Sequence, residues 1–555
     1  MKLSLAVPLF HPSQTSVLVN RVALAVVLII ALSVRFNSIA VPVIWYDEAY
    51  SLLLARETPA RIWALTALDV HPPLYYVLLH YWVAIWGDAA LPARAMSALA
   101  DVGTLLLCIK LMSLISTRRA TWIAALLLAL LPISVRYSQE VRMYTLLGFW
   151  LMGATVALVC WARAPDRKRF AVIYVLLMSA AFYTHYFAGL CVLVHWLFWW
   201  QSRVTRNGKA ISFSLWIVAN LGIVLLYLPW MPHFIEQLGG TSSLGWIKPV
   251  SLHGALTLVW QFTVLGATSS ESSIWYLAPF FLMLLFAVTL IVSDAGERRF
   301  NLLLVSYFFV PLIALYLIAL VLPLFVPRYL VFSAPALAMI TAVALDKWGA
   351  HWTALRHAVL LICVVAQLYG LTMLYRQSDG LNGTDMRRSS GYRELALAIK
   401  REVQPGDVII LDSLISYLPF TYYNTTGIQP RFHIRSSLEA FLASPVLGGY
   451  ALIPDPLKWI YFQDLVVLQC GRRIWWVSYE SKKNFGQLLS KGWTQTVELR
   501  SGPMTAYLLV NEARSASDEA DNSSGIRLPP AHSAQNCPPA PSATSANKTR
   551  RSLPQ

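Results

Sequence analysis

Long apolar runs alternate with short polar stretches over the first 375 residues of the chain. Each run holds roughly 18–22 residues, the length that an α-helix needs to cross a membrane. A further apolar stretch at 252–268 could be another span or a helix lying in the membrane surface. The pattern predicts a polytopic α-helical membrane protein with about 11 (10–13) transmembrane helices. We place them near 17–38, 93–115, 120–137, 143–162, 170–185, 187–201, 211–230, 275–293, 300–322, 329–346 and 357–375.

The pattern changes after residue 375 to one typical of a soluble α/β domain. Residues 392–403 show the periodicity of an amphipathic helix, and strands are expected at 407–412, 473–479 and 504–510. Residues 511–555 are rich in Ser, Ala, Asn and Pro without periodicity, which predicts a disordered tail. We therefore expect a membrane domain over 1–375, an α/β domain over 376–510 and a disordered tail over 511–555.

A polar and aromatic loop at 39–92 follows the first apolar run. Thr58 is placed to cap a short helix that opens with Pro59. A second helix is expected after Pro72-Pro73, and its Tyr and Trp residues suit the lipid headgroup zone. Both are predicted to be juxtamembrane helices that wall a cavity.

Charge is scarce and unevenly placed. Only 13% of residues are charged and 57% are hydrophobic, yet the net charge is +16. Basic residues gather in every second loop, which predicts that these loops and the N-terminus are cytoplasmic and the C-terminal domain extracytoplasmic. This distribution explains the net charge without a nucleic-acid partner. The six cysteines show no metal-binding or disulfide spacing.

Charged residues of the alternate loops are expected to converge on the outer side of the membrane. Charges at membrane depth are costly, and they tend to pair or to serve function. Carboxylates beside arginines suit a site that binds an anionic group and moves a proton. The group consists of Asp47, Glu48, Asp69, His71, Arg136, Glu140, Arg142, His185 and Arg328.

Structural roles are the alternatives for several of these residues. Asp69 could cap the helix after Pro72-Pro73, and Glu140 could form an ion pair with Arg142. Arg136 and Arg328 could anchor in the headgroups, and His185 could be a polar contact between helices. Asp47-Glu48, just outside a span, has no evident capping role. Asp101, inside the second expected span, suggests only a polar contact between helices.

Three motifs resemble bacterial relatives of the protein O-mannosyltransferases and of the aminoarabinose transferase of lipid A. They are the runs that start at Tyr46 (YDEAYS), Asp69 (DVHPPLYY) and Tyr137 (YSQEVRMY), in the order and spacing of that group. These proteins are glycosyltransferases with the membrane-embedded GT-C fold, and the resemblance covers roughly residues 15–375.

The resemblance implies a polyprenyl-phosphate sugar as the donor, with Asp47 as general base on the acceptor hydroxyl. Glu48 and Asp69 would belong to the catalytic group. His71 stands where the O-mannosyltransferases have a histidine and the aminoarabinose transferases a lysine, which favours a neutral sugar. Arg142, Arg328, Tyr144 and Tyr329 would bind the donor phosphate. His71, Glu140, Tyr137 and His185 would bind or support the sugar and acceptor. A divalent metal held by Asp47 and Glu140 stays open, and no other cofactor is implied.

The sequence as a whole thus predicts an inverting hexosyl- or pentosyltransferase of a bacterial inner membrane. Its partners would be the lipid-linked sugar, membrane lipids, and a protein, lipid or glycan acceptor. Two alternatives remain: a transporter or flippase of lipid-linked sugars, and a membrane-anchored ligand-binding receptor. A transporter would carry charges and broken half-helices near the membrane midplane, whereas here the charges are expected at one face.

Overall fold

A computed structural model describes residues 14–204, 210–239, 247–266, 273–292, 298–348, 352–381, 384, 391–433, 452, 461–462, 473–479, 485 and 493–511. The chain forms two compact units. The first comprises residues 1–389 and 443–453, and the second comprises residues 390–442 and 454–555. The expected tail at 511–555 lies outside the described residues except for Asn511.

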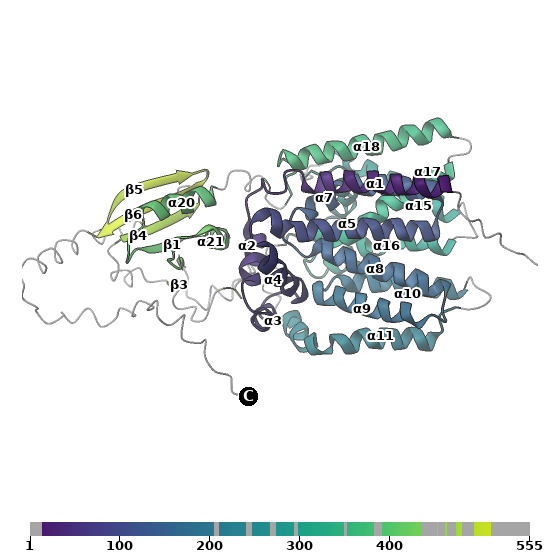
Figure 1. Cartoon of the computed structure of the whole chain (residues 1–555), viewed down its shortest axis with the longest axis horizontal. Helices are drawn as coiled ribbons and strands as arrows, with labels where there is room; N and C mark the ends of the chain where they lie inside the picture. The colour runs from purple at the N-terminus through teal and green to yellow at the C-terminus, as the bar shows by residue number, and fades with distance from the viewer. Residues whose placement is uncertain are drawn as a thin grey trace, which may run out of the picture. The chain divides into compact units, whose positions relative to one another are not determined.

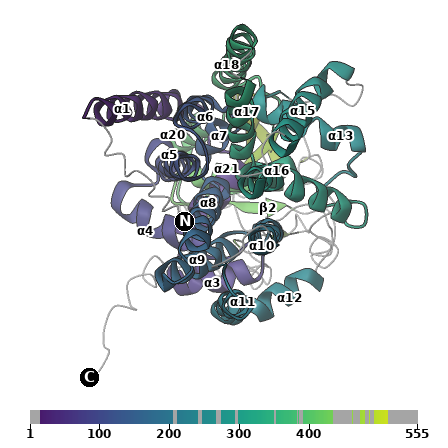
Figure 2. The same ribbon diagram turned by 90° about the vertical axis from the view of Figure 1, so that its right-hand side faces the viewer.

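The first unit is a bundle of long helices (Figure 1). Figure 2 looks along the bundle and shows α8 near its middle, where α5, α9 and α10 pack against it. The long helices are α1 (Gln14–Phe36), α5 (Ala90–Ile115), α6 (Arg118–Leu130), α8 (Tyr144–Arg163), α9 (Lys168–Thr184), α10 (Ala188–Val204), α11 (Phe213–Tyr227), α15 (Ala278–Val292), α16 (Arg298–Ala319), α17 (Pro335–Trp348) and α18 (Thr353–Tyr375).

Each expected apolar run forms a helix. Within the described residues, seven helices are long and apolar enough to cross a membrane, and nine if each of two bent pairs is one span. The other two expected spans correspond to α9 and α10, which have 17 residues each. The multi-pass membrane architecture is confirmed, whereas the count of eleven stays a prediction.

The expected twelfth apolar stretch does not form a span. Its described part contains only the short helices α13 (Leu252–Leu256) and α14 (Leu258–Thr263). Helices of five and six residues are too short to cross a bilayer. α14 instead packs against α7, α15 and α18.

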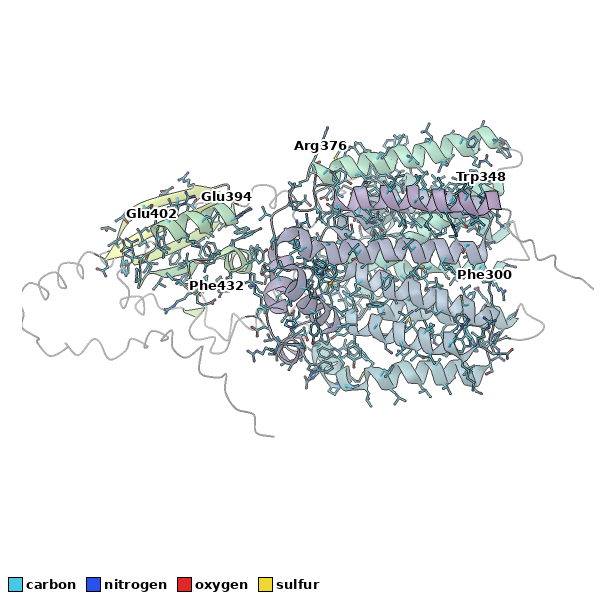
Figure 3. The ribbon with its side chains drawn as sticks, in the orientation of Figure 1. Phe300, Trp348, Arg376, Glu394, Glu402 and Phe432 are labelled. Carbon is cyan, nitrogen blue, oxygen red and sulfur yellow. The ribbon has the colours of Figure 1, made fainter. Side chains whose placement is uncertain are left out.

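Short helices gather at one end of the bundle, which we call the site end. They are α2 (Tyr46–Ala55), α3 (Pro59–Ala67) and α4 (Leu74–Trp86) (Figure 1). Thr58 caps α3 as expected, because its side chain accepts a hydrogen bond from Arg61 N at 3.3 Å. Figure 3 shows Arg376 at this same end, and Phe300 and Trp348 at the opposite end.

The third span, made of α6 and α7, is broken immediately before the site end. α6 ends at Leu130, and α7 (Pro132–Ser138) continues at an angle of 50°. Pro132 cannot donate a backbone hydrogen bond, so carbonyl groups before it lose their helical partners. Arg35 supplies replacements by donating to the carbonyls of Ala129 at 2.9 Å and Leu128 at 3.3 Å.

Arg35 also supplies the partner for the buried charge of Asp101. Its guanidinium lies 2.7 Å from the Asp101 carboxylate, and both side chains are buried. The contact therefore joins α1 and α5 to the end of α6. On the other side of α7, Gly370 lets α18 approach closely: a Cβ there would lie 2.8 Å from Pro132 and 2.6 Å from the Val264 carbonyl oxygen.

The second unit has a six-stranded sheet of order β3-β2-β1-β4-β6-β5. β3 (Tyr461–Phe462), β2 (Arg431–His433), β1 (Val408–Leu411) and β4 (Arg473–Tyr479) are parallel, whereas β6 (Met504–Asn511) pairs antiparallel with β4 and with β5 (Trp493–Ser501). The helices are α20 (Tyr392–Glu402) and α21 (Leu414–Tyr423). The expected helix at 392–403 and all three expected strands are present.

Candidate active site

Asp47 and Glu48 lie in the first turn of α2, which begins at Tyr46 after the extended residue Trp45. Carboxylates are favoured there by the positive end of the helix dipole. Successive residues of a helix point in directions about 100° apart. The two side chains accordingly differ: that of Asp47 is 19% exposed and that of Glu48 is fully buried.

Glu48 is bound on both carboxylate oxygens. Arg94 of α5 donates to them at 2.7 and 2.6 Å, and the backbone N–H of Val141 donates to Oε1 at 3.0 Å. Arg94 also donates to the carbonyls of Ile39 and Pro42. The sequence analysis placed Glu48 in the catalytic group. In the structure its carboxylate links α2 to α5 and to the loop after α7.

Asp47 faces two guanidinium groups. Its Oδ2 lies 3.9 Å from Nε of Arg142 and 3.7 Å from a terminal nitrogen of Arg328. At these distances the contacts are ion pairs without a direct hydrogen bond. Asp47 thus keeps its carboxylate oxygens available for a hydroxyl, next to two positive charges.

Arg142 is held by α2 and α4. Its guanidinium donates to Ser51 Oγ at 3.3 Å, to the Asp47 carbonyl at 3.4 Å and to the Tyr76 hydroxyl at 3.5 Å. It also lies over the Tyr144 ring, 6.0 Å from the centroid. An ion pair of Arg142 with Glu140 was an alternative in the sequence analysis, but Glu140 pairs with Arg136 at 2.5 Å.

The loop at 139–143, which carries Arg142, is tied to distant parts of the bundle. Gln139 donates to the carbonyl of Arg35 at 3.0 Å, in the last turn of α1, and to that of Asn37 at 2.8 Å, just beyond the helix. Ser97 of α5 donates to the Arg142 carbonyl at 3.3 Å. With the Val141 contact to Glu48, these bonds give the loop a defined position at the site end.

Asp69 and His71 lie between α3 and α4. Asp69 does not cap α4, since no side chain caps that helix. Instead its carboxylate lies 4.0 Å from Nδ1 of His71. Burial raises the pKa of Asp69, but His71 and Arg142 lower it by more than burial raises it. The pKa of Asp69 is therefore below its ordinary value. Burial lowers the pKa of His71, so the imidazole is neutral beside an ionised carboxylate.

His185 lies between α9 and α10 and faces His71, with 5.8 Å between the ring centroids. Its Nδ1 accepts a hydrogen bond from Phe187 N at 3.3 Å, whereas its buried Nε2 has no partner among the described residues. Burial, followed by His71, Arg142 and Arg328, holds the pKa of His185 well below its usual range. The ring is therefore a neutral group with one open hydrogen-bonding position.

Aromatic rings surround these groups. Tyr329 lies 5.3 Å from His185, and Tyr144 lies 6.0 Å from it and 5.3 Å from Tyr137, between ring centroids. Tyr329 belongs to η4 (Pro327–Ser333), which also carries Arg328. Arg328 is only 12% exposed and faces Asp47, so it does not anchor in the headgroups.

Arg136 is buried rather than anchored at the membrane surface. Its side chain is 3% exposed and pairs with Asp379 at 2.8 Å as well as with Glu140. The sequence analysis did not identify Asp379 or Arg94 as part of the site. A signal existed for Arg94, since a charge within an apolar span needs a partner, but the sequence does not name that partner.

A metal site is not supported by the donor groups. Within the described ranges, no three His, Cys, Asp or Glu side chains are grouped to hold a metal ion. Glu140, half of the pair considered in the sequence analysis, is bound by Arg136. Asp47, the other half, faces two arginines. A dication would meet guanidinium charge here, so no step through a metal is derived.

No protein-family model and no curated protein matches this sequence. Solved structures are nevertheless similar. ArnT from Cupriavidus metallidurans in the apo state has a TM-score of 0.59 at 14% identity, over 88% of this chain and 98% of that one. ArnT bound to undecaprenyl phosphate has a TM-score of 0.58 at 15% identity, over 89% and 98%.

A second similar protein is the archaeal oligosaccharyltransferase AglB from Archaeoglobus fulgidus, in complex with an inhibitory peptide and a dolichol-phosphate. Its TM-score is 0.54 at 13% identity, over 90% of this chain and 75% of that one. Likeness at such identities establishes the fold. The chain therefore has the GT-C fold of membrane-embedded glycosyltransferases, as its motifs predict.

Proposed function

We propose that this protein is an inverting glycosyltransferase that moves a sugar from a polyprenyl phosphate to an acceptor hydroxyl. The observation that carries the proposal is the Asp47 carboxylate, which accepts no hydrogen bond from a described residue and lies 3.9 and 3.7 Å from Arg142 and Arg328. The site thus combines a proton acceptor with two charges suited to a phosphate. Undecaprenyl phosphate and dolichol-phosphate in the similar structures support a lipid-phosphate donor.

In the proposed reaction, Asp47 takes the proton of the acceptor hydroxyl while its oxygen attacks the anomeric carbon. The bond from that carbon to the phosphate oxygen breaks, and its electron pair stays on the phosphate. The polyprenyl phosphate gains one negative charge, which Arg142 and Arg328 stabilise. Attack opposite the leaving group inverts the anomeric configuration.

The neutral imidazoles of His71 and His185 are assigned to the sugar. His185 has an open Nε2, whereas Nδ1 of His71 faces the Asp69 carboxylate at 4.0 Å, so Nε2 of His71 is the atom assigned to a sugar hydroxyl. A neutral imidazole can donate a hydrogen bond to a hydroxyl or accept one from it. Tyr144 and Tyr329 line the phosphate side, and Tyr137 supports Tyr144. Glu48 and Glu140 are positioning residues in this mechanism. Asp69 keeps His71 oriented, and the transferred group is a hexose or a pentose.

We further propose that the site opens to the outer side of a bacterial inner membrane. Basic residues at helix ends support this orientation. α16 begins with Arg298, two residues before Phe300, which lies at the end opposite the site end (Figure 3). Arg119 at the start of α6 pairs with Asp346, two residues before Trp348 at that same end. Acceptors there include proteins, lipids and glycans.

The test is Asp47→Asn in vesicles supplied with polyprenyl-phosphate sugars and candidate acceptors. The variant keeps the shape of the side chain but cannot take the proton, so transfer should fall by about 10²–10⁴. Asp88→Asn, at a surface pair with Arg56, is the matched control and should transfer normally. Wild-type transfer by the Asp47 variant would refute the mechanism. Passage of lipid-linked sugar across the vesicle without transfer would favour a transporter.

A further inference from the structure

Arg136 bridges two stretches of chain that lie far apart in sequence. It stands in the last turn of α7 and binds Glu140 in the loop that follows. Its guanidinium also donates to Asp379 at 2.8 Å and to Thr384 Oγ1 at 3.3 Å, beyond the end of α18. Glu140 and Asp379 are fully buried, so the three charges form one internal cluster.

The segment beyond α18 is folded to present Asp379. Gln377 and Gly380 have positive φ angles of 50° and 64°, which turn the chain on both sides of Asp379. The Asp379 carboxylate accepts hydrogen bonds from Leu381 N at 2.9 Å and from Thr384 Oγ1 at 2.5 Å on Oδ1, while Oδ2 receives Arg136. Both oxygens of this buried carboxylate are thus used.

The cluster of Arg136, Glu140 and Asp379, which we call the clamp, holds the loop that carries Arg142. Glu140 and Arg142 are two residues apart in that loop, and Arg142 is the residue that faces Asp47. The other ties of the loop come from α1, α2 and α5. Through Arg136, the loop is also linked to Asp379, which follows α18 late in the sequence of the first unit.

We propose that Arg136 and Asp379 are positioning residues that hold the loop at 139–143, so that Arg142 meets the donor phosphate. The segment after α18 is then part of the donor site, although it contributes no group to the chemistry. The inference rests on the proposed function in assigning Arg142 to the phosphate. It predicts that weakening the clamp impairs donor binding more than the chemical step.

Asp379→Asn in the full-length protein is the main test. An amide cannot accept from Arg136 as strongly, and the loop should lose part of its order. We expect the KM for the lipid-linked donor to rise about tenfold with kcat at saturating donor nearly unchanged. Hydrogen exchange at residues 139–143 should become faster, whereas exchange in α8 should not.

The matched control is Asp346→Asn at the other end of the bundle, where Asp346 likewise accepts from a threonine, Thr117, and pairs with an arginine, Arg119. It should leave donor KM and loop exchange unchanged. Asp379→Glu, which keeps the charge, should recover part of the donor affinity. An Asp379→Asn protein with wild-type donor KM and wild-type loop exchange would overturn the proposal.

Binding of undecaprenyl phosphate separates this inference from the proposed function. Asp47→Asn should still bind this lipid while transfer is lost, and Asp379→Asn should bind it more weakly. If wild-type protein transfers no sugar, the proposed function fails. The clamp is then judged by loop exchange and lipid binding alone, and unchanged values in Asp379→Asn refute it.

Discussion

Two adjacent carboxylates at the start of α2 have opposite environments, and this difference defines their roles. Asp47 is partly exposed and faces two arginines across more than a hydrogen-bond distance. Glu48 is fully buried, and Arg94 donates a hydrogen bond to each of its carboxylate oxygens. An acid with both oxygens occupied cannot accept a substrate proton without breaking those bonds. These environments support the proposal that Asp47 is the reactive carboxylate and that Glu48 holds α2 in place.

Glu48→Gln should destabilise the protein more than Asp47→Asn does. The substitution leaves Arg94 buried without its counter-charge, a loss of roughly 3–5 kcal/mol for a broken internal pair. Thermal unfolding in detergent measures this, and the Asp47 variant is its control. Equal unfolding midpoints for Glu48→Gln and wild type would contradict the role of Glu48 in holding α2 in place.

His185 should make stability depend on pH. Its pKa in the folded protein is lowered by burial, whereas histidines of the unfolded chain titrate near about 6.5. The unfolded state therefore takes up the proton first, and stability should fall as the pH drops below about 6.5. Asp69, whose folded pKa is lowered, acts at lower pH, since its contribution is lost only as the pH falls through that folded pKa.

The measurement is the thermal midpoint between neutral and mildly acidic pH. His185→Gln cannot take up a proton and should lose less stability on acidification than wild type. His357→Gln changes an exposed histidine at the start of α18 and is the control. The interpretation fails if wild type and His185→Gln lose stability in parallel.

At the scale of elements, the bend between α6 and α7 sets the direction in which the chain enters the loop at 139–143. Pro132 breaks the span, and α7 then carries the chain to Arg136 and the loop at 139–143. Arg35 satisfies the carbonyls freed at the break and pairs with Asp101. Arg35 lies in the last turn of α1, where its own carbonyl accepts a hydrogen bond from Gln139.

Arg35→Met should destabilise the bundle by roughly 3–5 kcal/mol, because Asp101 becomes an unpaired buried charge. The double variant Arg35→Met/Asp101→Leu should recover much of that loss, since replacing both members of a buried pair is often tolerated. Thermal unfolding of both proteins decides the matter. A double variant as unstable as the single one would mean that the carbonyl contacts outweigh the ion pair.

The helices were predictable from sequence, whereas the pairing of their charges was not. An apolar run must form a helix in a membrane because its backbone needs internal hydrogen bonds. Asp47, Arg142 and Arg328 were found through motifs and loop positions. Partners such as Arg94 for Glu48 depend on how helices rotate against each other, which no local pattern reveals. Asp379 was missed because the pattern break after residue 375 suggested that the second domain already began there.

At the scale of the molecule, the two ends of the first unit can be labelled separately through exposed residues. Asp88 lies just before α5 near the site end, and Arg119 lies at the start of α6 at the opposite end. Both side chains are exposed. In whole cells, Asp88→Cys should react with a membrane-impermeant thiol reagent and Arg119→Cys should react only after lysis. The reverse labelling would overturn the proposed orientation.

The second unit can be separated from the donor site by truncation. Every residue assigned to the site, and the Asp379 segment, belongs to the first unit, which includes residues up to 389. A chain ending at Ser389 loses the second unit and also residues 443–453 of the first unit, none of which is assigned to the site. It should therefore bind undecaprenyl phosphate as the full-length protein does. Because the α/β unit adds a surface outside the bundle, we expect its loss to change the ranking of acceptors. Transfer to several acceptors, compared at equal amounts of folded protein, measures this. If donor binding falls while acceptor ranking is unchanged, the second unit serves the donor site, and acceptor choice belongs to the bundle alone.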